Sequence, residues 1–245
     1  MGRPTSRTLS VGALFLAGCA AVYVLPSFIS SFRAQQFAYV GIYLIALIGL
    51  NILTGYTGQI SLGHGAFMAI GGYTTGILIS DQGLQIAGHT FSNDLKDIWT
   101  IPIAAVVAGA AGFLFGLPAL RLTGLYLALA TFAIAVSAPA VFKKFETFTG
   151  GGTGINLFGI KGLTGSISGV HVLGRKLDFY DWLYYLSWTI ALVLLAAAWF
   201  LLRGRIGRAF RAVRDSESAA ASSGVSLATY KTLAFAISAA YAGVA

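Results

Sequence analysis

Residues 49–67 read GLNILTGYTGQISLGHGAF, and Gly71-Gly72-Tyr73 follow in the same apolar pattern. Glycines interrupt this stretch repeatedly, and Asn, Gln, Ser and His side chains stand between them. Irregular backbone at membrane depth survives only where it is buried in protein or lines a wet cavity, and the backbone groups that it frees can bind polar solutes. The stretch therefore predicts a broken or re-entrant glycine-rich helix inside a membrane bundle.

The composition of the whole chain agrees with a membrane protein. Of its 245 residues, 57% are hydrophobic and only 10% are charged, a balance that a soluble globular domain would not tolerate. We expect an all-α fold, a polytopic transmembrane helical bundle that forms a single domain over residues 1–245. The expected spans fall at about 9–31, 36–54, 60–80, 99–120, 122–142 and 182–202, and from 231 to the end.

Both ends of the chain carry signals that affect this count of spans. The sequence stops at Ala245 inside an apolar pattern, so we expect a C-terminally truncated piece that lacks later spans. Near the start, Leu16-Ala17-Gly18-Cys19 resembles a lipoprotein cleavage box. Because the chain stays apolar from Ala20 to Ile29, we expect an uncleaved first span in which Cys19 is a packing residue.

The net charge of +8 reflects topology and not nucleic-acid binding, because the basic residues flank apolar spans or gather in one loop. The positive-inside rule makes that loop, residues 203–230, and the N-terminus cytoplasmic. Residues 143–181 then form an external loop. Its Gly150–Gly154 run is not a phosphate-binding loop, since the Lys-Ser/Thr ending and the following helix are missing.

The polar and glycine positions of the broken stretch are candidates for a translocation path. A second interpretation remains open, in which the glycines only allow close helix packing and the polar side chains only satisfy the broken backbone. His64 has no His, Cys or carboxylate at metal-ligand spacing, so we expect no metal. The candidate path residues are Asn51, Gln59, Ser61, Gly63, His64 and Gly65.

The sequence offers no catalytic set of side chains, so we expect no enzyme. Every Asp and Glu falls in an expected loop or interface, and a chain without ionisable groups inside its spans is not expected to energise transport alone.

Residues 203–231 are basic and helix-prone, with Phe210, Val213 and Ala220 at roughly helical spacing. They are interpreted as a docking face for a cytoplasmic partner, or as a positive loop that only fixes orientation.

Four stretches, in order, resemble the LivM-type permease subunits of bacterial branched-chain amino acid ABC importers. The first is Gly49–Tyr73, the second is LPALRLTGLYLA at 117–128, and the third is TGGGTGI at 149–155. The fourth runs from Gly207 to Gly224 and is followed by Tyr230-Lys231. Two departures stand out: serines at 218, 222 and 223 where relatives often have apolar residues, and Ala135-Val136-Ser137 where many relatives carry an acid.

The resemblance implies a permease domain in the bacterial inner membrane, assembled with several partners. These are a second related permease, two cytoplasmic ATP-binding subunits and a periplasmic substrate-binding protein, with membrane lipid around them. No cofactor is expected in this chain, since the partner subunits bind ATP. The resemblance identifies a cytoplasmic coupling helix that docks on an ATP-binding subunit; the residues assigned to it are Arg208, Arg211, Arg214, Asp215, Glu217, Ala220 and Gly224.

The expected function is inward transport of leucine, isoleucine or valine by alternating access, driven by ATP hydrolysis in the partners. Related permeases import urea and short amides, and no residue here decides between these substrates. A self-contained channel for urea-like solutes and a scaffold subunit without its own path are the other hypotheses.

Overall fold

The computed structural model describes most of the chain after residue 21. The described residues are 18, 20, 22–79, 84–86, 89–91, 97–120, 122, 124–145, 149–151, 154–155, 171–172, 175–176 and 179–245. Residues 9–17, 19 and 21 of the expected span 9–31 lie outside the described residues, as does most of the expected external loop 143–181.

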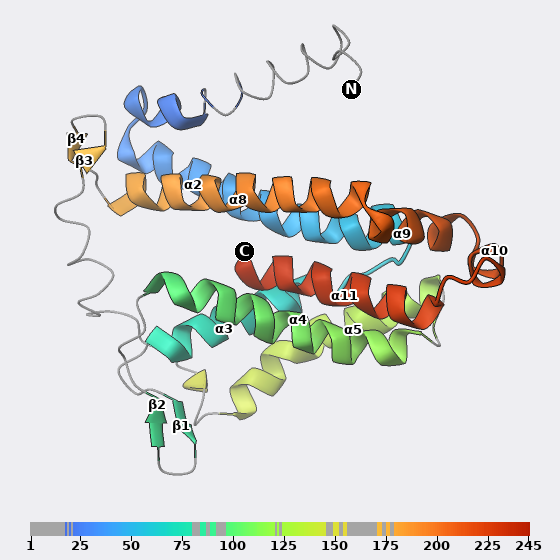
Figure 1. The fold of residues 1–245 in the computed structure, drawn as a ribbon. Helices are drawn as coiled ribbons and strands as arrows, with labels where there is room; N and C mark the ends of the chain where they lie inside the picture. Colours follow the sequence, from blue (N-terminus) through green and yellow to red (C-terminus); the bar gives the residue numbers. More distant parts are fainter. Residues whose placement is uncertain are drawn as a thin grey trace, which may run out of the picture.

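The described helices form two layers around a central helix (Figure 1). Helix α2 (Ser31–Asn51) pairs with α8 (Phe179–Arg203), and α3 (His64–Ile79) packs on α4 (Thr100–Ala119). Helix α11 (Leu227–Val244) contacts α2, α3 and α4, whereas α5 (Leu125–Lys144) packs mainly against α3. The fold class expected from the sequence is confirmed, since a helical bundle with a break in its glycine-rich stretch is what these elements form.

The short elements lie at the two ends of the bundle (Figure 1). At one end are α9 (Arg205–Asp215) and α10 (Glu217–Ser222). At the other end are two antiparallel hairpins, β1 (Leu84–Ile86) with β2 (His89–Phe91) and β3 (His171–Val172) with β4 (Arg175–Lys176). The remaining elements are the 3-10 turns η1 (Leu25–Ser27) and η3 (Asp97–Trp99) and the π-helix η2 (Ile52–Tyr56).

Four helical stretches among the described residues are long and apolar enough to cross a membrane. Each contains a window with a mean hydropathy of 2.0, and the shortest has 19 residues, close to the roughly 20 that a bilayer requires. They are Ser31–Tyr56, Thr100–Pro118, Leu125–Lys144 and Phe179–Arg203. The expected span 60–80 begins later, at His64, because residues 58–63 are not helical, and the last expected span begins earlier, at Leu227.

Glycines bring α11 into backbone contact with its neighbours, as expected for close helix packing in a membrane. A Cβ built on Gly112 of α4 would collide with Ala239 and lie 2.8 Å from the Phe235 carbonyl oxygen. On the α3 side, a Cβ at Gly71 would collide with the backbone of Gly243. These contacts require residues without side chains, so the glycine content has a packing role here.

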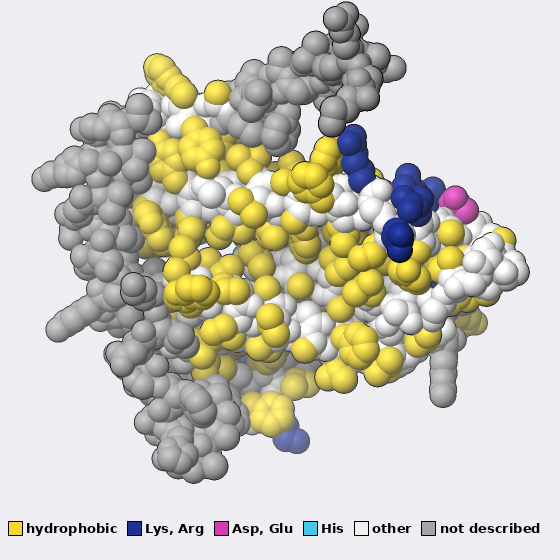
Figure 2. All heavy atoms as spheres, viewed as in Figure 1, with side chains coloured by type: hydrophobic (Ala, Val, Ile, Leu, Met, Phe, Trp, Pro, Cys, Tyr) yellow, Lys and Arg dark blue, Asp and Glu magenta, His cyan; other side chains and the backbone are white. Residues whose placement is uncertain are grey.

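The outer surface of the bundle is strongly apolar, and its charge is concentrated at one end. Figure 2 shows hydrophobic side chains over the flanks of the helices, as a lipid-facing surface requires. Phe32, Val106 and Phe200 are among the large apolar side chains that stay exposed. Lys and Arg side chains gather at the end that carries α9 (Figure 2).

Candidate functional site

The break in the glycine-rich stretch begins with a change of helix type. Helix α2 continues as the π-helix η2, a form that is rare and frequent at functional sites. The hydroxyls of Thr54 and Thr57 donate to carbonyls four residues earlier, a contact that bends helices. At Gly58 the backbone takes a φ of 70°, which favours glycine, and the helical path ends.

Residues 58–63 then run back into the bundle without helical structure. Two side chains hold this segment: Thr131 of α5 accepts a hydrogen bond from the Leu62 amide at 2.9 Å, and Ser61 accepts one from the Gly63 amide at 3.3 Å. Gly63 packs directly on Thr131, because an added Cβ would lie 2.9 Å from the Thr131 carbonyl oxygen. The irregular segment is therefore half-buried: Gln59, Ser61 and Gly63 lie against protein, whereas Gly58, Ile60 and Leu62 are exposed.

Helix α3 starts inside the bundle and not at its end. Nε2 of His64, the first residue of α3, lies 2.9 Å from the carbonyl oxygen of Ala46 on α2. Since a carbonyl oxygen only accepts, Nε2 carries the proton in this contact. Ala46 lies well before the end of α2, so α3 begins beside the body of α2, as in the discontinuous helices of transporters.

The six predicted path residues lie in different surroundings. Ser61 and His64 bond the backbone around the break, which agrees with the packing interpretation of these two side chains. Gln59 is different: it is only 6% exposed, and its side-chain amide nitrogen, Nε2, has no hydrogen-bond partner among the described residues. Asn51 and Gly65 are exposed, whereas Gly63 is buried.

Helix α9 turns its apolar face toward the bundle. Phe210 is completely buried and Val213 nearly so, and the Phe210 ring meets Tyr230 edge to face. Ala220 of α10 is buried as well, at 3% exposure. Phe210, Val213 and Ala220 therefore pack against the chain's own core, and docking of a partner on this segment stays a prediction. The opposite, charged face remains exposed; it carries Arg208, Arg211, Arg214, Asp215 and Glu217.

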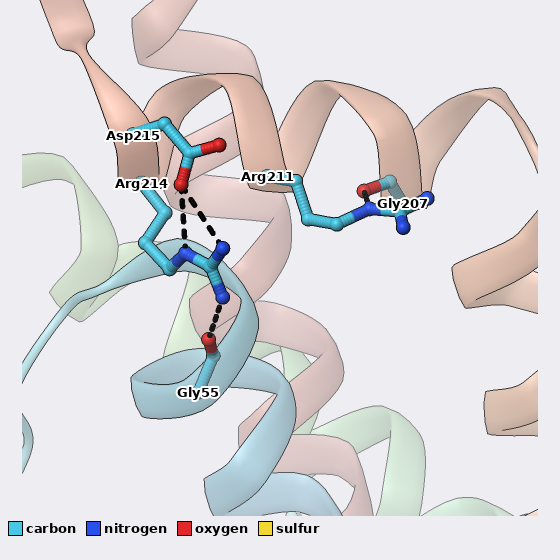
Figure 3. Close-up of polar contacts among 5 residues, drawn as sticks. All are labelled: Gly55, Gly207, Arg211, Arg214 and Asp215. Atoms are coloured by element: carbon cyan, nitrogen blue, oxygen red, sulfur yellow. Dashed lines mark hydrogen bonds and ion pairs between the residues drawn. The ribbon is translucent and has the colours of Figure 1, made fainter.

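Arg214 connects α9 to η2, where the break in the glycine-rich helix begins (Figure 3). Its Nη1 donates to the carbonyl oxygen of Gly55 in η2 at 3.1 Å, while Nε and Nη2 donate to Asp215 at 3.1 and 3.0 Å. A cation beside the last carbonyls of a helix is stabilised by the helix dipole. Arg211, in contrast, donates to Gly207 within α9 itself at 3.2 Å (Figure 3).

A second ion pair joins α10 to α11. Lys231 Nζ lies 2.7 Å from a Glu217 carboxylate oxygen, and the Lys231 side chain is only 7% exposed, against 46% for Glu217. Lys231 lies within α11, and its nearly buried ammonium group is paired with a carboxylate from α10. Gly224, with a φ of 82°, ends α10 in a Schellman arrangement, since Val225 bonds Ala220 and Gly224 bonds Ala221 through backbone amides.

Two residues of this site escaped the sequence analysis. Thr131 was not predicted as part of the site, although a hydroxyl inside an apolar run is a signal of a polar partner. Lys231 was not predicted as part of the site, although Ser226, a typical helix-capping residue, precedes it and marks the start of the helix that carries it.

Comparisons with known proteins identify the family. The family model described as "Branched-chain amino acid transport system / permease component" matches residues 33–245. The chain is 37% identical over 220 residues to the "High-affinity branched-chain amino acid transport system permease protein LivM" of Escherichia coli K12. The same identity and length hold for the protein of that name from Salmonella typhimurium LT2.

The match covers 83% of this chain and 49% of each relative, so the chain spans about half the length of the curated relatives that it matches. No solved structure matches. The family model nevertheless covers most of the chain, including the broken helix, α9 and α10. The chain therefore belongs to the family of permease components of branched-chain amino acid transport systems.

Proposed function

We propose that this chain is a membrane subunit of an ABC importer and provides a path for leucine, isoleucine and valine across the bacterial inner membrane. The family supports a transport role and not an enzymatic one. The single observation that carries the mechanism is the contact of Arg214 with Gly55, which connects the exposed charged helix to the broken helix.

The proposed mechanism begins outside this chain. Two cytoplasmic subunits bind and hydrolyse ATP, and the exposed charged face of α9 and α10 docks on one of them. Movement of these short helices is transmitted through Arg214 to the end of η2 and through Glu217 to α11. The break between Gly58 and His64 then opens alternately to the two sides, as in transporters with discontinuous helices.

The orientation follows from the distribution of charge. Arg203, Arg205, Arg208 and Arg211 belong to the α9 end of the bundle, which we assign to the cytoplasm by the positive-inside rule. The chain would assemble with a second related permease and receive substrate from a periplasmic binding protein. Gln59 is the strongest candidate for contact with a polar substrate group, because its buried amide nitrogen lacks a hydrogen-bond partner within the described residues.

The transport proposal is tested with the complete transporter that contains this chain, reconstituted in vesicles with the binding protein. Leucine uptake is expected only with ATP on the cytoplasmic side, and isoleucine and valine are expected to compete. Competition by urea or acetamide alone would assign the chain to amide transport. Uptake without ATP would contradict the proposal in favour of a channel.

The docking proposal is tested separately with Arg208→Glu, a charge reversal on the exposed face of α9. We expect the ATP-binding subunits to co-purify less and leucine uptake to fall with them, because opposite charges at an interface become like charges. Unchanged co-purification and uptake would contradict docking at this face.

A further inference from the structure

A cavity of about 130 Å³ lies between α3, α4, α5 and α11. Its walls are apolar and include Phe67 of α3, Phe115 of α4 and Phe235 of α11. Gly63 and Thr131, which hold the irregular backbone in place, also line it. The cavity thus adjoins the break in the glycine-rich helix.

Helix α5 forms one wall of the cavity with a single stripe of residues. Leu127, Ala130, Thr131 and Ile134 recur at the three- and four-residue spacing of one helix face. The same helix leaves most of its other side chains exposed and packs mainly against α3. The wall is therefore a helix with few neighbours, tied to the re-entrant segment through the Thr131 hydroxyl.

The size and lining of the cavity restrict what it accepts. An apolar cavity of about 150 Å³ lined by Leu, Ile and Phe stays free of water and binds benzene, a six-carbon molecule. A cavity of about 130 Å³ with a similar lining accepts a branched group of four carbons and offers no partner for a charge.

We propose that this cavity receives the aliphatic side chain of the amino acid as it passes, while the amino and carboxylate groups remain outside it, beside the re-entrant segment that Gly63 and Thr131 connect to the cavity. The inference rests on the proposed function and adds a location to it: the cavity is the part of the path that distinguishes leucine from smaller amino acids.

The test uses two matched leucine substitutions on α5. Ala130→Leu fills the cavity with three added carbons, whereas Ala133→Leu makes the same change on the exposed face of the same helix. The complete set of membrane and ATP-binding subunits is prepared without the periplasmic binding protein, so that only these subunits select the ligand. A diazirine analogue of leucine is then photo-crosslinked, and the labelled residues are identified by mass spectrometry.

We expect the label on residues lining the cavity. The yield of this labelling should fall at least about tenfold in Ala130→Leu and change little in Ala133→Leu, because methylene-sized differences in apolar pockets give roughly 10- to 200-fold discrimination. A second variant, Ile134→Ala, enlarges the cavity and is expected to let phenylalanine compete better for the label.

Equal labelling of Ala130→Leu and Ala133→Leu, with unchanged competition by phenylalanine in Ile134→Ala, would overturn the inference. Label confined to residues outside the cavity would do so as well. ATP-driven leucine uptake by the unaltered transporter separates the two proposals. If uptake occurs but the cavity is not labelled, the cavity inference alone is wrong; if uptake does not occur, the proposed function is wrong.

Discussion

Replacing Arg214 by glutamine tests whether α9 stabilises the end of the broken helix. The substitution removes the hydrogen bond from Nη1 to the Gly55 carbonyl and the paired bonds to Asp215. A hydrogen bond from a charged donor contributes about 1.5–3 kcal/mol when shielded. The Arg214 side chain is 44% exposed, so water replaces part of that contribution.

Two smaller effects accompany the lost hydrogen bond. A cation at a helix C-terminus adds about 0.3–1 kcal/mol, and an exposed ion pair such as Arg214–Asp215 adds about 0–1 kcal/mol. We therefore expect local opening of η2 to become easier by about 1–2 kcal/mol, which multiplies the open population roughly 5- to 30-fold. Hydrogen–deuterium exchange of the amides at 52–57 measures this population directly.

Arg211→Gln is the matched control, because Arg211 bonds only its own helix at Gly207 among the contacts described. It removes the same charge from the same helix and leaves the Gly55 contact intact. We expect exchange at 52–57 to accelerate in Arg214→Gln and to stay close to the unaltered rate in Arg211→Gln. Equal acceleration in both variants would refute the contact as the cause, and so would no acceleration in either.

The two remaining predictions concern thermal unfolding of the detergent-solubilised transporter. Glu217→Ala leaves the nearly buried ammonium group of Lys231 without its anion and should lower the free energy of unfolding by about 1–3 kcal/mol. Lys231→Met leaves a half-exposed carboxylate in water and should lower it by less than about 1 kcal/mol. The reverse order would contradict the burial argument. Gly71→Ala forces α3 away from the Gly243 backbone and should lower stability by about 1–3 kcal/mol, whereas a Cβ at Gly72 meets open space, so Gly72→Ala should be neutral or slightly stabilising. Equal melting temperatures for the two glycine variants would count against backbone contact.

The break in the glycine-rich helix was predictable because local chemistry determines it. Gly58 adopts a left-handed conformation that other residues resist, and Thr54 and Thr57 compete for the helix carbonyls just before it. The change to π-helix was not predictable from the pattern. It depends on how the end of α2 fits against α9 and α11, which no local spacing specifies.

The orientation of α9 could not be predicted for a related reason. The spacing of Phe210 and Val213 indicates an amphipathic helix. An apolar face can pack against a partner protein or against the chain's own core, and the spacing does not distinguish the two. The tie from Arg214 to Gly55 joins residues 159 positions apart, and the bond between Thr131 and Leu62 spans 69 positions. Contacts at such separations follow from the assembled fold and leave no trace in hydrophobic periodicity.

Arg214 and Glu217 are near neighbours in sequence, yet they contact different helices of the bundle. Arg214 bonds Gly55 in η2, the continuation of α2, and Glu217 pairs with Lys231 in α11. The short segment between α9 and α10 is therefore connected to two long helices at once, so a displacement of either short helix would reach η2 and α11 together.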